Sequence, residues 1–234
     1  MAYSLGLKFG YGLFETIYYN GHLEDFDRHM RRLNESLIKL NMSPVDCDEV
    51  LKNALLHLEP SGHNAIRISV YQDKDQVITY ETRNHIQKES YDVKFSSIKR
   101  HSSQPLFQLK STCHLSYFLE KQSLKDYDEA LHFNEKGHLT EGIYTNVFFV
   151  KSGIFYTPAV DCGILPGIYR EKVIETLKKL GIPIKIGYYN REDIESADEV
   201  FMTNALIKIM PVRRLEGQTF KEDLYTKLLI KEML

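Results

Sequence analysis

Glu141-Gly142-Ile143-Tyr144-Thr145-Asn146-Val147-Phe148 places a carboxylate directly before an apolar strand. Upstream lies Lys110, in the run Phe107-Gln108-Leu109-Lys110-Ser111. Downstream, Gly163-Ile164-Leu165-Pro166-Gly167-Ile168-Tyr169-Arg170 reads as a turn that opens a helix. An amine can form a Schiff base with an aldehyde, and a helix N-terminus can bind a phosphate-sized anion. An amine, a carboxylate and such an anion site are what pyridoxal phosphate (PLP) needs from a protein.

Further motifs accompany these three segments in a fixed order. They are Phe9-Gly10-Tyr11-Gly12-Leu13-Phe14-Glu15-Thr16, His29-Met30-Arg31-Arg32-Leu33, the run 196–205 and Pro211-Val212. With them the chain resembles, from about Phe9 to Val212, the fold-type IV PLP enzymes, the class IV aminotransferases. That family includes branched-chain and D-amino-acid aminotransferases and 4-amino-4-deoxychorismate lyase. The resemblance implies a two-domain α+β fold, like that of D-amino-acid aminotransferase, with PLP in the inter-domain cleft.

The hydrophobic patterns also indicate two blocks of mixed strands and helices, typical of an α+β protein. In the first, residues 1–98, we expect a strand at 13–19, helices at about 26–41 and 46–58, and strands at about 64–71, 76–82 and 91–98. Residues 99–109 are polar and lack periodicity, which predicts a linker. Residues 110–234 form the larger block, the PLP-binding domain by resemblance. In it, a hairpin turn at 134–137 is expected to join strands at 130–133 and 146–150, and the helix after Gly167 is expected to end near Leu180.

Composition narrows the classes of function. The chain has 234 residues, 43% of them hydrophobic and 26% charged, with a net charge of -2 and no basic stripe. We therefore expect no nucleic-acid partner. The cysteines, Cys47, Cys113 and Cys162, are scattered, which predicts neither a disulfide framework nor a metal site and suits a reduced, cytoplasmic location. No signal peptide and no membrane-spanning run are apparent, so no membrane association is expected.

Two residues carry the chemistry that the resemblance implies. Lys110 would form the Schiff base and, once substrate displaces it, would move the Cα proton as an acid/base. Glu141 would face the pyridine nitrogen and keep it protonated, so that the ring acts as an electron sink. The alternatives are a surface lysine at the end of the linker and a surface glutamate at the end of a hairpin. Buried glutamates need a partner, and PLP would provide one.

Other residues would hold the phosphate and the ring. Backbone N–H groups of Ile168 and Tyr169 would meet the phosphate at a helix start, with Tyr169 standing where relatives carry Thr. Arg32 would add a fixed cation suited to bidentate contact, unless it lies on a solvated helix face. The third phosphate position falls on Asn204 and Ala205, where Thr203 or backbone N–H groups are the alternatives.

His114, four residues after Lys110, would lie near the phenolic oxygen of PLP. A Tyr often occupies that position in the family. A packed or solvated histidine is an equally good interpretation.

The lyase branch fits the local sequence best. Lys110-Ser111-x-x-His114-Leu115 and Thr203-Asn204-Ala205-Leu206 look most like that branch. Phe14 stands where D-amino-acid aminotransferases use a Tyr, and Gln72-Asp73-Lys74-Asp75 stands in place of their Arg-x-His. The expected activity is therefore that of 4-amino-4-deoxychorismate lyase, which releases pyruvate and p-aminobenzoate. Arg67 is a candidate partner for the carboxylates of this small, amino-acid-like substrate, with a solvated strand face equally open.

Two alternatives stay open at this point. One is a class IV aminotransferase that acts on branched-chain or D-amino acids. The other is a degenerate PLP-binding protein, because relatives have about one more pair of strands before Phe9-Gly10 and an acidic residue where Tyr11 stands. The resemblance further implies a homodimer.

Overall fold

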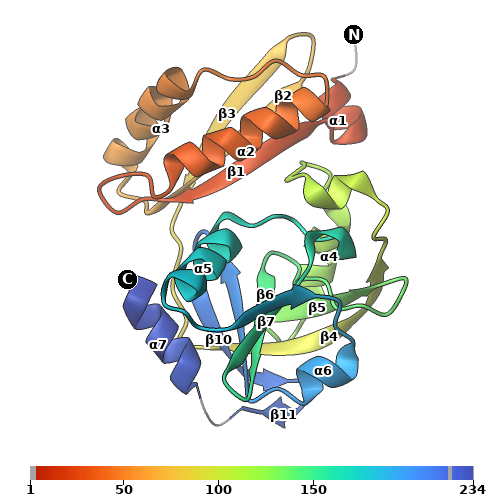
Figure 1. Cartoon of the computed structure of the whole chain (residues 1–234). Coiled ribbons are helices and arrows are strands. Elements are labelled where there is room, and N and C mark those ends of the chain that lie inside the picture. The colour runs from red at the N-terminus through yellow and green to blue at the C-terminus, as the bar shows by residue number, and fades with distance from the viewer. Residues whose placement is uncertain (1–3, 221–222, 234) are drawn as a thin grey trace. The chain divides into compact units, whose positions relative to one another are not determined.

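The chain folds into two compact units (Figure 1). The structure is a computed structural model, and it describes residues 4–220 and 223–233. Unit 1 contains the described residues up to Ile86 together with Leu109–Leu115. Unit 2 contains Gln87–Gln108 and the chain from Ser116 onwards.

Unit 1 is a three-stranded antiparallel sheet with helices. The strands are β1 (Gly12–Tyr18), β2 (Ala65–Gln72) and β3 (Gln76–Arg83), in the order β1-β2-β3. The helices are α1 (Leu5–Phe9), α2 (Phe26–Lys39) and α3 (Cys47–Ser61). The apolar stripe of α2 packs with that of α3 and with the inward side chains of β1 and β2 into one buried cluster. The apolar faces of the helices and the inward face of the sheet therefore pack into a single core.

The segment that carries Lys110 returns to unit 1 and lies along β1. The Phe14 N–H donates to Lys110 O at 2.9 Å, and the Thr112 N–H donates to Gly12 O at 2.8 Å. Leu13 and Ser111 form an antiparallel bridge. Because β1 is otherwise an edge strand of this sheet, these bonds satisfy backbone groups that would lack a strand partner, and they fix the position of the Lys110 backbone.

Unit 2 is built on a mixed sheet in the order β5-β4-β10-β9-β6-β7-β8, with β11 beside β10. Its strands are β4 (Tyr91–Arg100), β5 (Glu129–Asn134), β6 (Asn146–Lys151), β7 (Ile154–Pro158), β8 (Ile184–Gly187), β9 (Glu199–Asn204), β10 (Lys208–Leu215) and β11 (Gln218–Thr219). Its helices are η1 (Pro105–Gln108), α4 (Leu115–Gln122), η2 (Val160–Cys162), α5 (Ile168–Lys179), α6 (Arg191–Glu195) and α7 (Leu224–Met233).

Helices cover the two sides of this sheet through separate apolar clusters. One cluster joins α5 and α7 to the sheet through Val173, Leu177 and Leu229. The other contains Ile194 of α6 and Met202 of β9. Successive residues along a strand such as β9 therefore alternate between the two cores, as a sheet with both faces covered requires.

The division into units differs from the one expected from the sequence. The strand expected at 91–98 as part of the first domain is β4, which pairs with β5 and β10 of unit 2. The expected linker 99–109 is partly regular, because β4 continues to Arg100 and η1 follows. The expected hairpin between 130–133 and 146–150 is wrong, since β5 pairs with β4 while β6 pairs with β7 and β9. The first and the last of these differences arise from long-range strand pairing, which local patterns do not encode.

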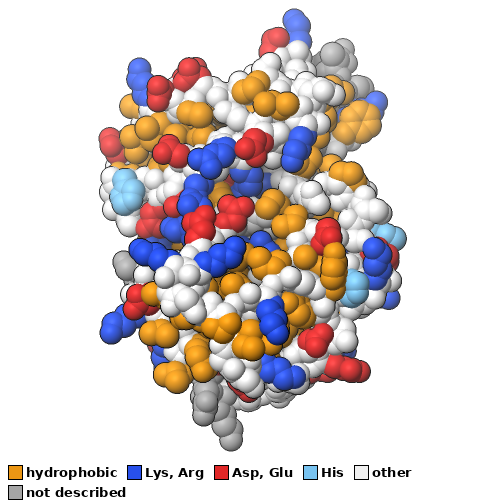
Figure 2. Space-filling view, in the orientation of Figure 1, with side chains coloured by type: hydrophobic (Ala, Val, Ile, Leu, Met, Phe, Trp, Pro, Cys, Tyr) orange, Lys and Arg blue, Asp and Glu red, His pale blue; other side chains and the backbone are white. Residues whose placement is uncertain are grey.

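Two surface observations complete the fold. Acidic and basic side chains are interspersed on the face drawn in Figure 2, where the chain is described. Among the described residues, every helix is too short or too polar to cross a membrane.

Candidate functional site

Phe14 gathers three of the expected site residues in unit 1. Lys110 Nζ lies 4.5 Å from the centroid of the Phe14 ring, and Arg67 Cζ lies 3.6 Å from the same point. The His114 ring meets Phe14 edge-on, at 5.0 Å between centroids. Phe14 itself is buried in β1, so its ring is a fixed platform. Both cations gain from the electron-rich face of the ring, which orients them without neutralising them.

Arg67 reaches this ring from the neighbouring strand. It lies on β2, opposite Thr16 in the register with β1, and its Nε donates to Ser69 Oγ at 3.2 Å. The guanidinium of Arg67 and the amine of Lys110 therefore lie beside the same ring. Of the two interpretations of Arg67, the solvated strand face fits less well, because the guanidinium is only partly exposed and is stacked on an aromatic ring.

Arg32 is held by a buried carboxylate that the sequence analysis did not single out. Its Nε and Nη2 donate to Oε1 and Oε2 of Glu15 at 2.8 and 2.7 Å, and His29 Nδ1 lies 2.7 Å from Glu15 Oε2. Burial works to raise the pKa of Glu15, but Arg32 and His29 outweigh it and lower the pKa to about 2. Arg32 is therefore not a solvated residue: a bidentate pair fixes the orientation of its guanidinium.

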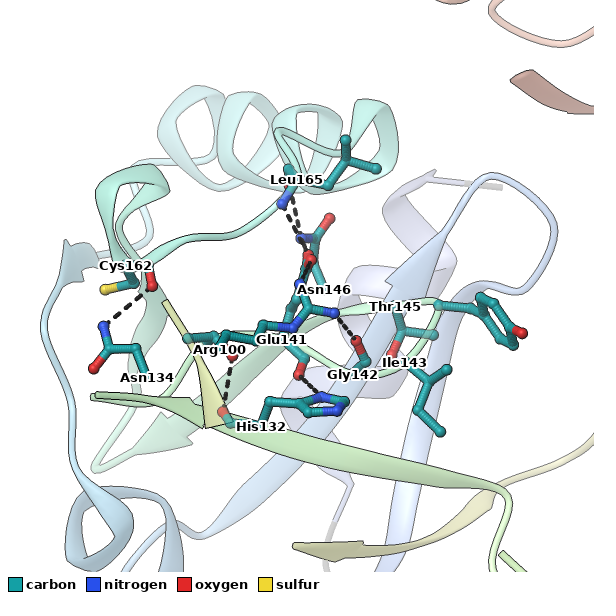
Figure 3. A network of polar contacts seen from close by, with 12 residues as sticks. Arg100, His132, Asn134, Glu141, Gly142, Ile143, Thr145, Asn146, Cys162 and Leu165 are labelled. Carbon is teal, nitrogen blue, oxygen red and sulfur yellow. Dashed lines mark hydrogen bonds and ion pairs between the residues drawn. The ribbon is translucent and has the colours of Figure 1, made fainter. Parts of the chain in front are cut away.

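Glu141 lies at the centre of a buried polar network in unit 2 (Figure 3). Oε1 accepts from Nη1 of Arg100, which also donates from Nη2 to Gly142 O at 3.2 Å. Oε2 accepts from Asn146 Nδ2 at 2.8 Å and from the Leu165 N–H at 3.1 Å. Burial raises the pKa of Glu141, against the opposing effect of the Arg100 guanidinium and the Leu165 N–H. The alternative of a surface glutamate is wrong, because only 6% of this residue is exposed.

Asn146 connects this carboxylate to the start of α5. Besides Glu141, its Nδ2 donates to Leu165 O at 3.0 Å. Its Oδ1 approaches Gly167 so closely that a Cβ on Gly167 would lie 1.9 Å away. Gly167 is the N-cap of α5 and makes no side-chain capping bond. The close approach therefore requires glycine, and the α5 N-terminus is placed next to the Glu141 network.

Ile168 and Tyr169 form the first turn of α5, as expected, and both side chains are buried. Their backbone N–H groups belong to the turn whose donors have no partner within a helix. The Tyr169 side chain packs in the apolar cluster with Val173 and Leu177, which explains how an aromatic residue is accommodated here. The substitution of Thr by Tyr thus leaves the backbone donors in place.

Asn204 ends strand β9 and Ala205 lies in the turn that follows, and the amide of Asn204 stabilises this turn. Its Oδ1 accepts from the N–H groups of Leu206 and Ile207 at 2.8 and 2.9 Å, and its Nδ2 donates to Tyr144 O at 3.2 Å. The Asn204 side chain therefore shapes the turn after β9. Phosphate contacts in this turn would come from the backbone or from the adjacent Thr203.

The family model for class IV aminotransferases matches residues 12–215. The chain belongs to the class IV aminotransferase family. An aminodeoxychorismate lyase of Bacillus subtilis (strain 168) is 33% identical to it over 233 residues, which covers 90% of this chain and 80% of the relative.

Solved structures of the family share the fold. A Legionella pneumophila structure described provisionally as a 4-amino-4-deoxychorismate lyase has a TM-score of 0.90 and 26% identity, and covers 97% of this chain and 91% of that one. A branched-chain aminotransferase of Thermoproteus uzoniensis, solved with norvaline, has a TM-score of 0.87 and 28% identity, and covers 97% and 86%. These similarities confirm the α+β, fold-type IV prediction.

Class IV enzymes depend on PLP, which confirms the cofactor expected from the sequence. Unit 2 offers what a phosphorylated pyridine needs. It has a buried carboxylate in Glu141 and an α5 N-terminus without a side-chain cap. In addition, the buried hydroxyl of Thr203 has no hydrogen-bond partner among the described residues. Thr203 pairs with Asn146 across β9 and β6, so this hydroxyl belongs to the same region of the sheet. The residues present therefore fit the cofactor.

Sequence reasoning missed the residues that orient the expected ones. They are Glu15 and His29 around Arg32, and Arg100, Asn146 and His132 around Glu141. A signal for Glu15 existed, because it is a charged residue inside the apolar strand run Leu13–Ile17. Arg100 had no such signal, because it lies near the start of the polar stretch 99–109, which lacks periodicity.

Proposed function

We propose that this chain is a PLP-dependent 4-amino-4-deoxychorismate lyase. The observation that carries the proposal is the Phe14 platform, on which Arg67 and Lys110 both lie. A substrate with two carboxylates needs a fixed cation close to the reacting amine, and Arg67 provides one. The similarity to the Bacillus subtilis lyase over 90% of this chain supports the same choice.

In this proposal each expected residue has a defined role. Lys110 holds the cofactor covalently, Glu141 faces the pyridine nitrogen, and the N–H groups of Ile168 and Tyr169 bind the phosphate with Arg32. When bound, PLP supplies an electron sink for the carbon that carries the substrate amino group. His114 stacks edge-on against Phe14, so it can orient the ring on which Lys110 lies.

Lys110 performs the proton transfer once the substrate has displaced it. Its amine takes the proton from the carbon that carries the amino group. The carbon–oxygen bond to the enolpyruvyl group then breaks, that group leaves and becomes pyruvate, and the remaining ring becomes aromatic as p-aminobenzoate. Atoms and electrons balance without an oxidant or a second substrate. Arg67 would hold a carboxylate throughout and take no part in proton transfer.

A branched-chain or D-amino-acid aminotransferase is the second candidate. The similarity to the Thermoproteus uzoniensis branched-chain aminotransferase favours it. In an aminotransferase the amino group stays on the cofactor and an acceptor keto acid is required, whereas a lyase needs no acceptor.

Mixing the PLP-loaded protein with 4-amino-4-deoxychorismate in the absence of any keto acid separates the two activities. We expect many turnovers of p-aminobenzoate and pyruvate, with the absorbance of the loaded cofactor retained. If no p-aminobenzoate forms, while an L- or D-amino acid converts the cofactor to its amine form, the lyase proposal is wrong and the protein is an aminotransferase. If p-aminobenzoate does form, the variant Arg67→Gln tests the role of Arg67. It should raise KM for the dicarboxylate substrate much more than it lowers kcat.

A further inference from the structure

Arg100 is a buried cation whose only carboxylate contact among the described residues is Glu141. It ends strand β4, with 3% of its surface exposed, and its guanidinium donates both to Glu141 and to Gly142 O. Phe107 and Tyr117 lie against it, with ring centroids 5.1 and 5.0 Å from Cζ. Two hydrogen bonds and two aromatic rings therefore fix one orientation of this side chain.

The hydrogen bonds of Glu141 determine what else it can bind. Arg100, Asn146 and the Leu165 N–H occupy three of the roughly four lone-pair positions of a carboxylate. An ionised carboxylate accepts hydrogen bonds and cannot donate one. A ring nitrogen that meets ionised Glu141 must therefore carry a proton. A protonated Glu141 would instead suit a ring nitrogen without a proton.

Burial raises the pKa of Glu141, and the titratable groups around it act against that shift. Within unit 2 these groups are Arg100 from β4, His132 from β5 and Arg170 from the first turn of α5. His132 is engaged elsewhere, because its Nε2 lies 2.7 Å from Glu120 Oε2 and its Nδ1 lies 3.2 Å from the Glu141 backbone O. Arg170 donates from Nη2 to Pro158 O at 2.8 Å. Arg100 alone among these three donates to the Glu141 carboxylate.

We propose that Arg100 is a positioning residue that holds Glu141 ionised and thereby dictates a protonated ring nitrogen on the cofactor. The inference rests on the proposed placement of Glu141 at that nitrogen. It extends the proposed function by naming the residue that keeps the ring nitrogen protonated and so makes the cofactor a stronger electron sink. Arg100 acts through Glu141 and touches neither substrate nor reacting atoms in this role.

The test measures PLP affinity and the absorbance of bound PLP against pH in the holoenzyme, for Arg100→Gln, Glu141→Gln and the double variant. Arg100→Gln should weaken PLP binding roughly 10- to 100-fold, as loss of a supporting residue does around other bound groups. It should also shift the pH-dependent absorbance change of the bound cofactor to higher pH, because Glu141 then loses its proton less readily. In the Glu141→Gln background the same change at Arg100 should have little further effect on either quantity.

Two further variants keep the test decisive. Arg100→Lys retains the charge but cannot reach both Glu141 and Gly142 O, so it should restore the position of the pH transition and part of the affinity. Arg213→Gln is the matched control, because Arg213 pairs with Asp92 at 2.9 Å on the surface of the same unit, and it should leave both quantities unchanged. If Arg100→Gln fails to fold, Arg100→Lys and the double variant against Glu141→Gln still give the comparison.

The proposal is wrong if Arg100→Gln weakens PLP binding equally in both backgrounds, or if the pH transition does not move. Neither measurement depends on which substrate is turned over. A protein that lacks lyase activity but shows the coupled shift would refute the proposed function and leave the role of Arg100 standing.

Discussion

Among the described residues, each unit contains one buried glutamate paired with an arginine, and the two pairs differ in their chemistry. In unit 1, Glu15 receives two bonds from Arg32 and one from His29, and its pKa falls to about 2. In unit 2, Glu141 receives one bond from Arg100 together with bonds from an amide and a backbone N–H, and burial raises its pKa.

The difference lies in how completely the surrounding donors compensate the negative charge of each carboxylate. Two potentially cationic partners stabilise ionised Glu15, so this carboxylate serves to fix Arg32. A single cation and neutral donors leave the ionisation of Glu141 sensitive to what binds beside it. Buried groups poised in this way are typical of functional sites, whereas fully compensated pairs are typical of structural support.

Replacing Lys110, the amine proposed to form the Schiff base, should have the largest effect. Lys110→Ala should lower lyase turnover by roughly 10³-fold or more, because it removes both the covalent attachment and the acid/base. The yellow colour of the loaded protein should disappear as well. Lys121→Ala is the control, since Lys121 contacts the backbone O of Asp128, and it should behave like the wild type. Retention of a borohydride-reducible chromophore in Lys110→Ala would show that another lysine holds PLP.

Glu15→Gln should break the support of Arg32. Removing one partner from a buried ion pair costs about 3–5 kcal/mol, so the free energy of unfolding measured in urea should fall by that amount. Glu35→Gln, an exposed position on the same α2, is the matched control and should change stability by less than about 0.5 kcal/mol. A loss for Glu15→Gln no larger than that of the control would mean that the triad does not stabilise unit 1.

The same pair predicts that the stability of the protein depends on pH in the acid range. Because the pKa of Glu15 drops from 4.5 to about 2, its contribution is complete above pH 4.5 and is lost as the pH falls from 4.5 towards 2. The shift corresponds to about 3 kcal/mol. Unfolding curves across this range should show the loss in the wild type, and Glu15→Gln should flatten it.

Gly167→Ala tests the connection between Glu141 and the α5 N-terminus. The new Cβ would lie 1.9 Å from Asn146 Oδ1, so Asn146 must move and its bonds to Glu141 and Leu165 must weaken. We expect PLP affinity to fall roughly 10- to 100-fold, with a stability loss of about 1–3 kcal/mol. Gly187→Ala is the control, because its Cβ meets only the end of the Tyr189 side chain, at 3.1 Å. Equal PLP affinities for the two variants would contradict the proposed anion site.

Thr203→Val should have the smallest effect and separates cofactor binding from folding. The Thr203 hydroxyl is buried and unpaired among the described residues, so removing it should change the unfolding free energy of the cofactor-free protein by less than about 1 kcal/mol. PLP binding should nevertheless weaken several-fold. An unchanged dissociation constant for PLP would mean that this hydroxyl does not contact the cofactor.

The sequence predicted the elements whose causes are local. The helix expected at about 26–41 appears as α2, and Asn190 and Asp193 form a capping box at α6, for which their three-residue spacing is a local cause. Asp46 caps α3 by accepting the Glu49 N–H at 3.0 Å. Asp25 precedes α2, but it has φ 53° and makes no side-chain cap bond, so this helix begins without the cap that an aspartate at this position usually provides.

What the sequence could not predict depends on contacts between distant segments. β4 belongs to unit 2 because it pairs with β5 and β10. The sequence of β4 alone does not indicate which strands it pairs with. The same holds for the site. Motifs identified Lys110 and Glu141, but the groups that set their surroundings, Phe14 as a platform and Arg100 as an ion partner, are defined only by the fold.

Borohydride reduction of the PLP-loaded protein, followed by peptide mapping, asks directly whether Lys110 holds the proposed cofactor and whether Glu141 contributes to the binding of that cofactor. We predict that the pyridoxyl mass is found on the peptide containing Lys110, and that Glu141→Gln lowers the amount trapped at sub-saturating PLP. A label on Lys121 or Lys125, or trapping that is independent of Glu141, would contradict the assignment of one cofactor to both residues.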